Sequence, residues 1–186
     1  MPRTDCGDVL FPHRDEGPQH FDPAQLSDPV VRRGDEYHFK NSLSGGEADM
    51  VVTYGRDEDT VLIGDWDGDG RDTLGVRRGK VYHLKNSISG GDADSVVPYG
   101  RADDRVGVGD WDGDGHDTLG VRRGNQFHVR NTLSGGEADI VMTFGRSSDK
   151  AMVGDWDGDG SDTVGLRRVY EEPELSDRDA YDARMV

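Results

Sequence analysis

The feature that most constrains the fold of this chain is an acidic segment that occurs three times at an interval of 45 residues. The copies begin at Gly64, Gly109 and Gly154, and the first reads Gly-Asp-Trp-Asp-Gly-Asp-Gly-Arg-Asp-Thr. The flanking residues repeat with the same period, and they are rich in β-branched and aromatic side chains. Periods of about 40 to 50 residues with such β-prone content are typical of propeller blades rather than helical solenoids. The repeat therefore predicts an array of similar all-β units.

Each repeat contains four short segments with strand character, separated by turn residues. In one period we expect strands over 60–63, 73–78, 81–86 and 95–99, and no segment of the repeat has helical periodicity. Four strands in an antiparallel meander form a β-propeller blade. The predicted fold class is thus all-β, with propeller-like blades. A β-solenoid is the next alternative, although its coils are usually shorter, and an immunoglobulin-like sandwich is disfavoured because it needs no sequence period.

The chain holds about three and a half to four such repeats. One period before the first acidic loop, residues 20–28 are read as a decayed fourth copy, and the last repeat keeps only its first two strands, through Arg168. We predict a mobile N-terminal segment over 1–18, a β-propeller repeat domain over 19–168 and an acidic C-terminal tail over 169–186. Either the N-terminal strands complete the last blade and close the ring, or open arcs from several chains form a larger ring. We favour a homo-oligomer that completes the ring.

The net charge of -16 is concentrated in the repeated loops. Each loop carries four aspartates, so twelve of the 38 acidic residues lie in three short segments, and the remaining 26 nearly balance 22 basic residues. Like charges packed this closely disfavour ionisation unless a cation lies among them. Charge placed so locally favours metal binding over a general role in solubility. No continuous basic surface is written in the sequence, so nucleic-acid binding is not expected.

Within each loop, oxygen ligands alternate along the chain. If Asp65 is position 1, carboxylates stand at positions 1, 3 and 5, Gly70 at position 6 permits a sharp turn, and the backbone carbonyl of position 7 adds a fourth oxygen. This pattern matches the first half of an EF-hand loop, but position 12 is Val76 instead of glutamate and no flanking helices are expected. An all-oxygen set with loose geometry suits Ca²⁺ better than Mg²⁺. The sequence predicts about three Ca²⁺ ions per chain.

The loop, its position between two strands and its period resemble the calcium loop of FG-GAP repeats, which occur in the integrin α-subunit propeller and in many bacterial repeat proteins. The resemblance covers about residues 19–168 and implies a β-propeller that binds calcium between the first two strands of a blade. The family usually places its last carboxylate at position 9, which is threonine here, whereas this chain has aspartate at position 8. Either the threonine supplies a neutral oxygen, or the aspartate reaches the ion through an altered loop or a water.

The predicted metal residues therefore occupy positions 1, 3, 5, 7, 8 and 9 of the three loops. They are Asp65, Asp67, Asp69, Arg71, Asp72 and Thr73; Asp110, Asp112, Asp114, His116, Asp117 and Thr118; and Asp155, Asp157, Asp159, Ser161, Asp162 and Thr163. Position 2 is tryptophan in each loop. We expect this residue to pack between blades or against the neighbouring loop, and the alternative is stacking against a sugar. The three are Trp66, Trp111 and Trp156.

Other repeated residues are given structural roles. The three equivalent histidines, His38, His83 and His128, are expected to lie on different blades and not to share a zinc ion. An arginine pair follows the second strand of each repeat, and we expect one arginine of each pair to bind a loop aspartate and the other to be solvated. No sequence motif of a hydrolase, a nucleotide-binding loop or a metalloprotease is present. We therefore predict that the protein is not an enzyme.

The predicted function is a calcium-stabilised propeller module for protein interaction or self-assembly, and the alternative is a calcium-dependent, lectin-like carbohydrate-binding propeller. The protein or glycan ligand is not identified by the sequence. No membrane span and no secretory signal are evident, because residues 1–20 hold only a short apolar run at 9–11. The compartment is left open, although calcium sites favour an extracellular location.

Overall fold

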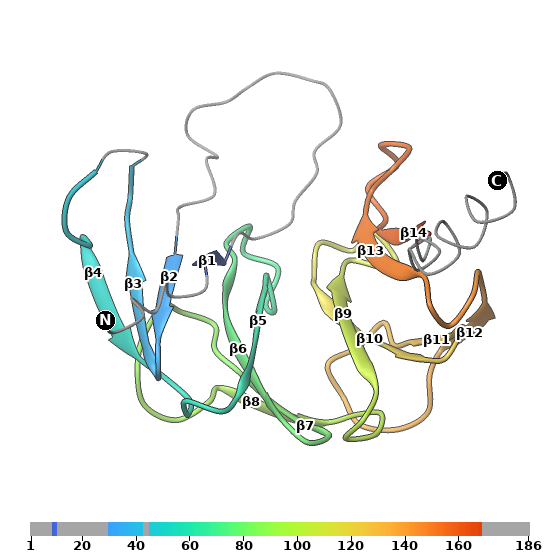
Figure 1. Ribbon diagram of the computed structural model, residues 1–186, viewed down its shortest axis with the longest axis horizontal. Helices are drawn as coiled ribbons and strands as arrows, with labels where there is room; N and C mark the ends of the chain where they lie inside the picture. Colours follow the sequence, from blue (N-terminus) through green and yellow to red (C-terminus); the bar gives the residue numbers. More distant parts are fainter. Residues whose placement is uncertain (1–8, 11–29, 43–44, 169–186) are drawn as a thin grey trace, which may run out of the picture.

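The computed structural model describes residues 9–10, 30–42 and 45–168, and every regular element in these ranges is a β-strand (Figure 1). Sheet 1 contains β1 (Val9–Leu10), β2 (Val30–Arg33), β3 (Glu36–Phe39) and β4 (Met50–Thr53). Sheet 2 contains β5 (Thr60–Gly64), β6 (Thr73–Arg78), β7 (Val81–Leu84) and β8 (Ser95–Pro98). Sheet 3 contains β9 (Arg105–Gly109), β10 (Thr118–Arg123), β11 (Gln126–Val129) and β12 (Ile140–Thr143). Sheet 4 contains β13 (Lys150–Gly154) and β14 (Thr163–Arg167).

The strands of each sheet are antiparallel and follow one another in chain order, as in a meander. The all-β prediction is confirmed, and so is the repeated four-stranded unit in sheets 2 and 3. The second strand begins and ends where the sequence predicts, at Thr73 and Arg78. The third strand is two residues shorter than predicted. It stops at Leu84 because the N–H of Asn86 donates to the Asp94 carboxylate (2.8 Å) instead of continuing the ladder.

Sheet 1 is the unit that contains the N-terminal strand. Within the segment predicted to be mobile, the structure describes Val9–Leu10 as a short strand paired with Val30 and Val31 of β2. The strand thus takes the place that β5 has in sheet 2. The decayed loop predicted at residues 20–28 lies outside the described residues, as do the rest of segment 1–18 and the predicted acidic tail, 169–186.

Neighbouring sheets are held together by buried side chains. One cluster joins sheet 1 to sheet 2 and includes Tyr37 and Leu74, and a second joins sheet 2 to sheet 3 and includes Trp66 and Leu119. The second strands of sheets 2 and 3 are buried over nearly their whole length, because a neighbouring sheet covers each face. The equivalent strand of sheet 4, β14, is at most half-buried. Sheet 4 is therefore at one end of the stack that the described strands form.

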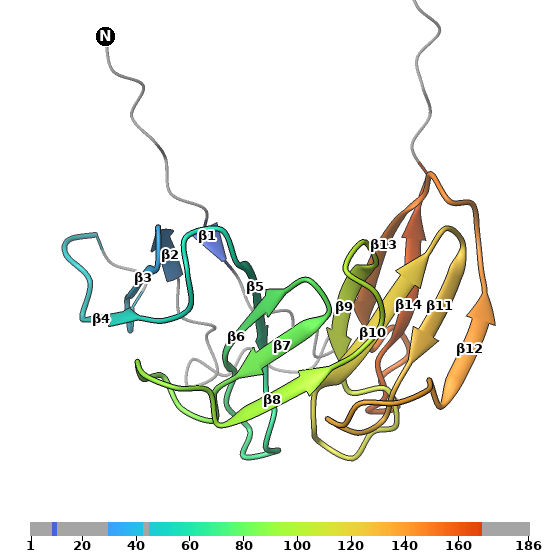
Figure 2. The ribbon, with the colours of Figure 1, turned by 90° about the horizontal axis from the view of Figure 1, so that it is seen from below.

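Figures 1 and 2 show the four sheets side by side in chain order, with sheets 1 and 4 at opposite ends of an open arc. Near the inside of the arc, β9 lies between β5 and β13. Among the described strands, none from sheet 1 pairs with a strand of sheet 4. A closed propeller ring thus stays a prediction, while the array of similar antiparallel sheets is observed.

The second arginine of the pair in sheets 2 and 3 remains within its own sheet. Arg78 makes two bonds of 2.7 Å to the carboxylate of Asp59, and Arg123 repeats this geometry in sheet 3. Antiparallel pairing places Thr60, the first residue of β5, opposite Arg77. Arg78 therefore reaches the turn before β5, whereas the acidic loop follows the other end of β5. The prediction that the paired carboxylate belongs to the acidic loop is wrong.

In sheets 1, 2 and 3, the first arginine of the pair crosses to the next sheet. The guanidinium of Arg77 lies over the ring of Tyr82, 5.6 Å from its centroid, and donates to the carbonyls of Arg101 and Asp104, both at 2.7 Å. Arg122 makes the equivalent bonds to the turn before β13. Arg77 and Arg122 are buried rather than solvated as predicted, because the turn of the following sheet lies directly over each of them. Arg167, in sheet 4, is exposed.

Candidate metal centre

Each acidic loop connects the first strand of a sheet to the second, so the three loops lie at equivalent places in sheets 2, 3 and 4. In each loop, carboxylate oxygens from positions 1, 3 and 5 lie within 4.8 Å of one another. The residue at position 1 is the most buried of each group, and the other two are exposed to solvent. The three groups are Asp65, Asp67 and Asp69; Asp110, Asp112 and Asp114; and Asp155, Asp157 and Asp159.

The carboxylate at position 1 organises its own loop. In the first loop, Oδ1 of Asp65 accepts the N–H groups of Gly68 (2.8 Å) and Asp69 (3.1 Å), and Oδ2 accepts the N–H of Gly70 (2.7 Å). Gly68 and Gly70 have positive φ angles of 71° and 85°, which favour glycine. The other two loops repeat the same three bonds, around Asp110 and Asp155.

This arrangement leaves exposed carboxylate oxygens close to one another at the mouth of the loop. Three negative groups within 4.8 Å repel one another. A divalent cation placed among them relieves the repulsion, and hard cations prefer oxygen ligands of this kind. Each of the three loops could therefore hold a metal ion. The donor set fits Ca²⁺ chemically, because positions 1, 3 and 5 supply carboxylate oxygens and no nitrogen or sulfur.

Position 7 contacts the preceding loop. The ring of His116 lies so close to Gly68 that a Cβ atom there would be 2.7 Å from it, and Oγ of Ser161 lies close to Gly113 in the same way. Nδ1 of His116 is 3.2 Å from a carboxylate oxygen of Asp114. Although desolvation acts in the opposite direction, this carboxylate raises the pKa of His116. The side chains of position 7 thus form contacts between loops, and a metal role for the position 7 carbonyls, that of Arg71 included, stays a prediction.

Position 8 also faces the preceding loop. Oδ2 of Asp117 accepts the N–H of Asp65 (2.8 Å), and Oδ2 of Asp162 accepts the N–H of Asp110 (3.0 Å). The structure therefore brings Asp117 and Asp162 beside position 1 of the preceding loop.

Position 9 lies at the start of the second strand. The hydroxyl of Thr73 is buried and donates to the carbonyls of Gly64 (3.3 Å) and Lys85 (2.5 Å), and Thr118 donates to the carbonyl of Gly109 (3.5 Å). Thr163, in the last loop, is exposed. The hydroxyls of the first two copies are thus bonded to backbone carbonyls, and a metal role for the position 9 threonines stays a prediction.

The tryptophans at position 2 share one geometry but differ in exposure. Each ring covers a glycine of the second strand, with closest distances of about 3 Å from the Cβ position on Gly75 or its equivalents. Trp66 is 4% exposed, Trp111 is half-buried and Trp156 is 51% exposed. The order follows the stack, because the next sheet covers the first ring fully and no described sheet follows the last. Packing between sheets therefore accounts for Trp66.

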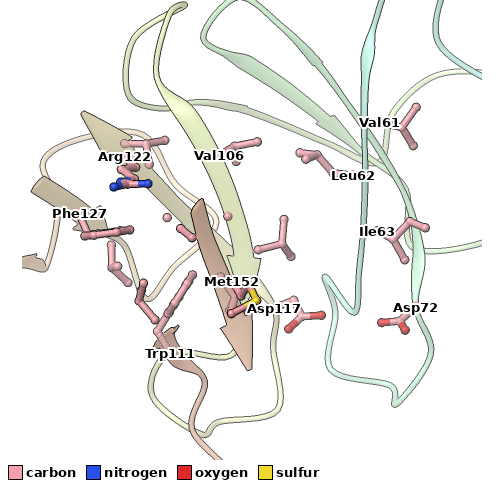
Figure 3. Close-up of a pocket in the computed structure, with 18 residues that line it drawn as sticks. Val61, Leu62, Ile63, Asp72, Val106, Trp111, Asp117, Arg122, Phe127 and Met152 are labelled. Carbon is pink, nitrogen blue, oxygen red and sulfur yellow. The ribbon is translucent and has the colours of Figure 1, made fainter. Parts of the chain in front are cut away.

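A cavity of about 390 Å³ lies between sheets 2, 3 and 4 and is lined mainly by apolar residues of their first strands (Figure 3). Val61, Val106 and Met152 represent the three strands. Its charged lining residues include Asp117 and Arg122, which are both engaged in bonds between sheets. The cavity thus follows the packing of the repeat and does not gather the three carboxylate groups.

The repeat also contains contacts that sequence reasoning missed. The carboxylate of Asp94 accepts the N–H of Asn86 and lies 3.1 Å from the ammonium of Lys85, and the same set recurs around Asp49 and Asp139. These residues recur every 45 positions, and this recurrence was the one sequence signal for the contacts. It did not identify the partners, because they are eight or nine residues apart across a turn. The predicted histidines lie in β3, β7 and β11, on three different sheets.

In the part of the chain that the structure describes, no helix has the length and apolar character required to cross a membrane. Comparisons with protein families, with curated proteins and with solved structures find no match to this chain. The geometry of the loops is therefore the main indication of function.

Proposed function

We propose that this chain is a calcium-binding repeat protein of the FG-GAP type, and that it acts as a non-catalytic module for protein interaction or self-assembly. The observation that carries the proposal is the occurrence of three equivalent carboxylate groups, each organised by the same three backbone bonds. A bound ion in this loop would connect the first two strands of its sheet. Calcium binding is then mainly a contribution to folding free energy.

Calcium is preferred over magnesium for a physical reason. Mg²⁺ requires near-ideal octahedral geometry and loses its water reluctantly, whereas Ca²⁺ accepts six to eight oxygens in irregular arrangements. Positions 3 and 5 are exposed, so their carboxylates can adjust to a larger ion and leave room for water ligands. We expect one ion in each loop.

Thermal unfolding tests the calcium proposal. We expect the melting temperature to fall by several degrees or more when EDTA replaces calcium, and magnesium to restore little of the loss, because ion binding stabilises only the folded state. A variant with Asp67→Asn, Asp112→Asn and Asp157→Asn is the matched control. These side chains are exposed, and the three substitutions remove one negative charge from each carboxylate group. This variant should melt at nearly the same temperature with calcium or EDTA. An unchanged wild-type melt in EDTA would remove the calcium claim.

The proposed partner at the end of the stack is a second copy of the chain. Phe144 and Trp156 are 47% and 51% exposed, whereas their equivalents Tyr99 and Trp66 are each 4% exposed beneath the next sheet. The surface beside sheet 4 thus carries the aromatic residues that elsewhere form a contact between two sheets. No described sheet packs against these residues. A sheet with the same repeat would complete this contact, and sheet 1 of another chain is such a sheet.

A carbohydrate-binding module is the second candidate, and the exposed ring of Trp156 is the observation that favours it. Trp66 is buried and has no free face for a sugar, so the recurrent pocket of a multivalent lectin is disfavoured. A glycan array probed in calcium, with Trp156→Ala as the control, separates the two candidates. Binding that this substitution abolishes would favour the carbohydrate module.

A further inference from the structure

The aspartate at position 8 forms a reciprocal contact with position 1 of the preceding loop. Oδ2 of Asp117 accepts the N–H of Asp65 at 2.8 Å, and the N–H of Asp117 donates to the carbonyl of Asp65 at 2.7 Å. The same two bonds join Asp162 to Asp110, at 3.0 and 2.6 Å. We call this pair of bonds the loop clasp. It connects residues that lie 52 positions apart in sequence and in different sheets.

The loop clasp holds the residue on which the preceding loop depends. Asp65 supplies the carboxylate that accepts three N–H groups of its loop, and its backbone N–H and carbonyl are both held by Asp117. Asp65 is fully buried and Asp117 is 8% exposed, so water competes little for these bonds. The orientation of the position 1 carboxylate is thus fixed from two sides.

The close approach of the loops also explains a repeated glycine. A Cβ atom on Gly64 would lie 2.9 Å from Val108 and 3.1 Å from Asp117, and a Cβ atom on Gly109 would lie 2.7 Å from Asp162. A Cβ atom on the corresponding Gly154 would have its nearest neighbour, the ring of Trp156, at 3.4 Å. The backbone before position 1 therefore has to lack a side chain wherever a following loop is present.

We propose that the aspartate at position 8 is a positioning residue for the cation site of the preceding loop, and that the clasp couples neighbouring sites. This inference rests on the proposed function. An ion that orders loop 110–114 also orders the strand start that carries Asp117, which steadies Asp65 in the next site. Because coupling between binding sites is reciprocal, occupancy of either site favours occupancy of the other. Residues that orient metal ligands typically change metal affinity about 10- to 100-fold when they are removed.

The competing account is that position 8 binds the ion of its own loop. The two accounts differ in which loop responds to a substitution. Under the clasp, removal of the Asp162 carboxylate weakens the site at 110–114. Under the competing account, it weakens the site at 155–159. Asp162 therefore gives a direct test, because both loops are described and each carries its own reporter.

The reporters are the glycine N–H groups at position 6. Gly115 donates to Oδ2 of Asp110 (2.8 Å) and Gly160 donates to Oδ2 of Asp155 (3.0 Å), so cation binding to either carboxylate alters the corresponding amide signal. Calcium titration of the full chain, followed by two-dimensional amide NMR, gives a separate midpoint for each loop. In Asp162→Ala we expect the Gly115 midpoint to rise about 10- to 100-fold. We expect the Gly160 midpoint to change by less than about threefold, which is below the range for lost ligands.

Two further variants keep the test decisive if Asp162→Ala folds poorly. Asp162→Asn retains an oxygen that can accept the N–H of Asp110, so its Gly115 midpoint should lie between those of wild type and Asp162→Ala. Asp157→Asn, which weakens loop 155–159 without touching the clasp, should also raise the Gly115 midpoint through the coupling. A raised Gly160 midpoint with an unchanged Gly115 midpoint in Asp162→Ala or Asp162→Asn would overturn the inference. So would an unchanged Gly115 midpoint in all three variants. If the amide signals of Gly115 and Gly160 in the wild-type chain do not change when calcium is added, the proposed function is overturned, and this inference with it.

Discussion

At the scale of single residues, carboxylates that are buried or half-buried make two kinds of contact in this chain. Those at position 1 of each loop accept backbone N–H groups, whereas Asp59 and Asp104 each accept a bidentate arginine. Asp104 also accepts the N–H of Arg101 at 2.8 Å, so its oxygens have three donors. Bidentate bonds between charged groups are stronger than neutral ones. The Arg123 guanidinium therefore lowers the pKa of Asp104 below its ordinary value.

This contact predicts an acid-dependent contribution to stability. Because the folded pKa of Asp104 is below the unfolded value of about 3.9, its contribution is complete above that pH and is lost as pH falls through the folded pKa. Asp104→Asn should lower the free energy of unfolding at pH 7 by about 3 kcal/mol. The variant should lose less additional stability than wild type between about pH 4 and pH 2.

Urea unfolding across this pH range measures the effect. Asp103→Asn is the matched control, because Asp103 is the exposed neighbour in the same turn. Wild type and both variants keep the carboxylates of the acidic loops. Differences between their profiles of unfolding free energy against pH therefore report the contribution of Asp104. Equal profiles for Asp104→Asn and Asp103→Asn would contradict the account.

At the scale of elements, each sheet is stabilised by what the next sheet places on it. The turn before β9 accepts bonds from Arg77, the loop after β9 holds Asp65, and β9 and β10 cover the ring of Trp66. Sheet 4 provides these contacts to sheet 3 but receives none from a described successor. Equivalent residues in sheets 3 and 4 are thus natural pairs for comparison.

Two glycines at the end of the first strands provide such a pair. Alanine at Gly109 would place its Cβ 2.7 Å from Val153 and from Asp162, whereas at Gly154 the nearest atom is the ring of Trp156, at 3.4 Å. Gly109→Ala should therefore lower the free energy of unfolding by about 1 to 3 kcal/mol, the range for overpacked interiors. Gly154→Ala should change it by less than about 0.5 kcal/mol. Urea unfolding of both variants would contradict this account of the sheet interface if the two losses were equal.

The strands and the carboxylate groups could be predicted because their signals are local. Alternating β-prone residues placed β6 correctly, and Asp65, Asp67 and Asp69 are close in space because they are close in sequence. The clasp between Asp117 and Asp65 could not be predicted in the same way, since it depends on how two sheets are placed side by side. The arginine partners were missed for the same reason, because antiparallel register decides which turn Arg78 reaches.

At the scale of the whole molecule, the repeat forms an open arc with two different ends. Sheet 4 has two strands among the described residues, and its surface presents Met152 and Trp156 to solvent. Large exposed apolar residues that are grouped in this way mark interaction surfaces. No described strand pairs with the outer edge of β14 beside them, and such an edge invites pairing with another chain.

Self-assembly through this end is a testable expectation. Sedimentation should give a mass above the 20.4 kDa of one chain in calcium, because the ordered end surface can then accept a second copy. Trp156→Glu should return the mass to that of one chain. Val96→Glu is the control, since Val96 is 56% exposed but lies in β8 of an inner sheet. A wild-type mass of one chain at all concentrations, or equal loss of assembly in both variants, would contradict this prediction.

The central claim is that the three repeated loops bind calcium, and the most direct measurement is the stoichiometry of binding by isothermal titration calorimetry. The account predicts about three Ca²⁺ ions per chain, one for each carboxylate group, and about two after Asp112→Asn and Asp114→Asn together. The glycine bonds to Asp110 remain in that variant, so its fold should persist. No measurable calcium binding by the wild-type chain, or an unchanged stoichiometry in the variant, would contradict the claim.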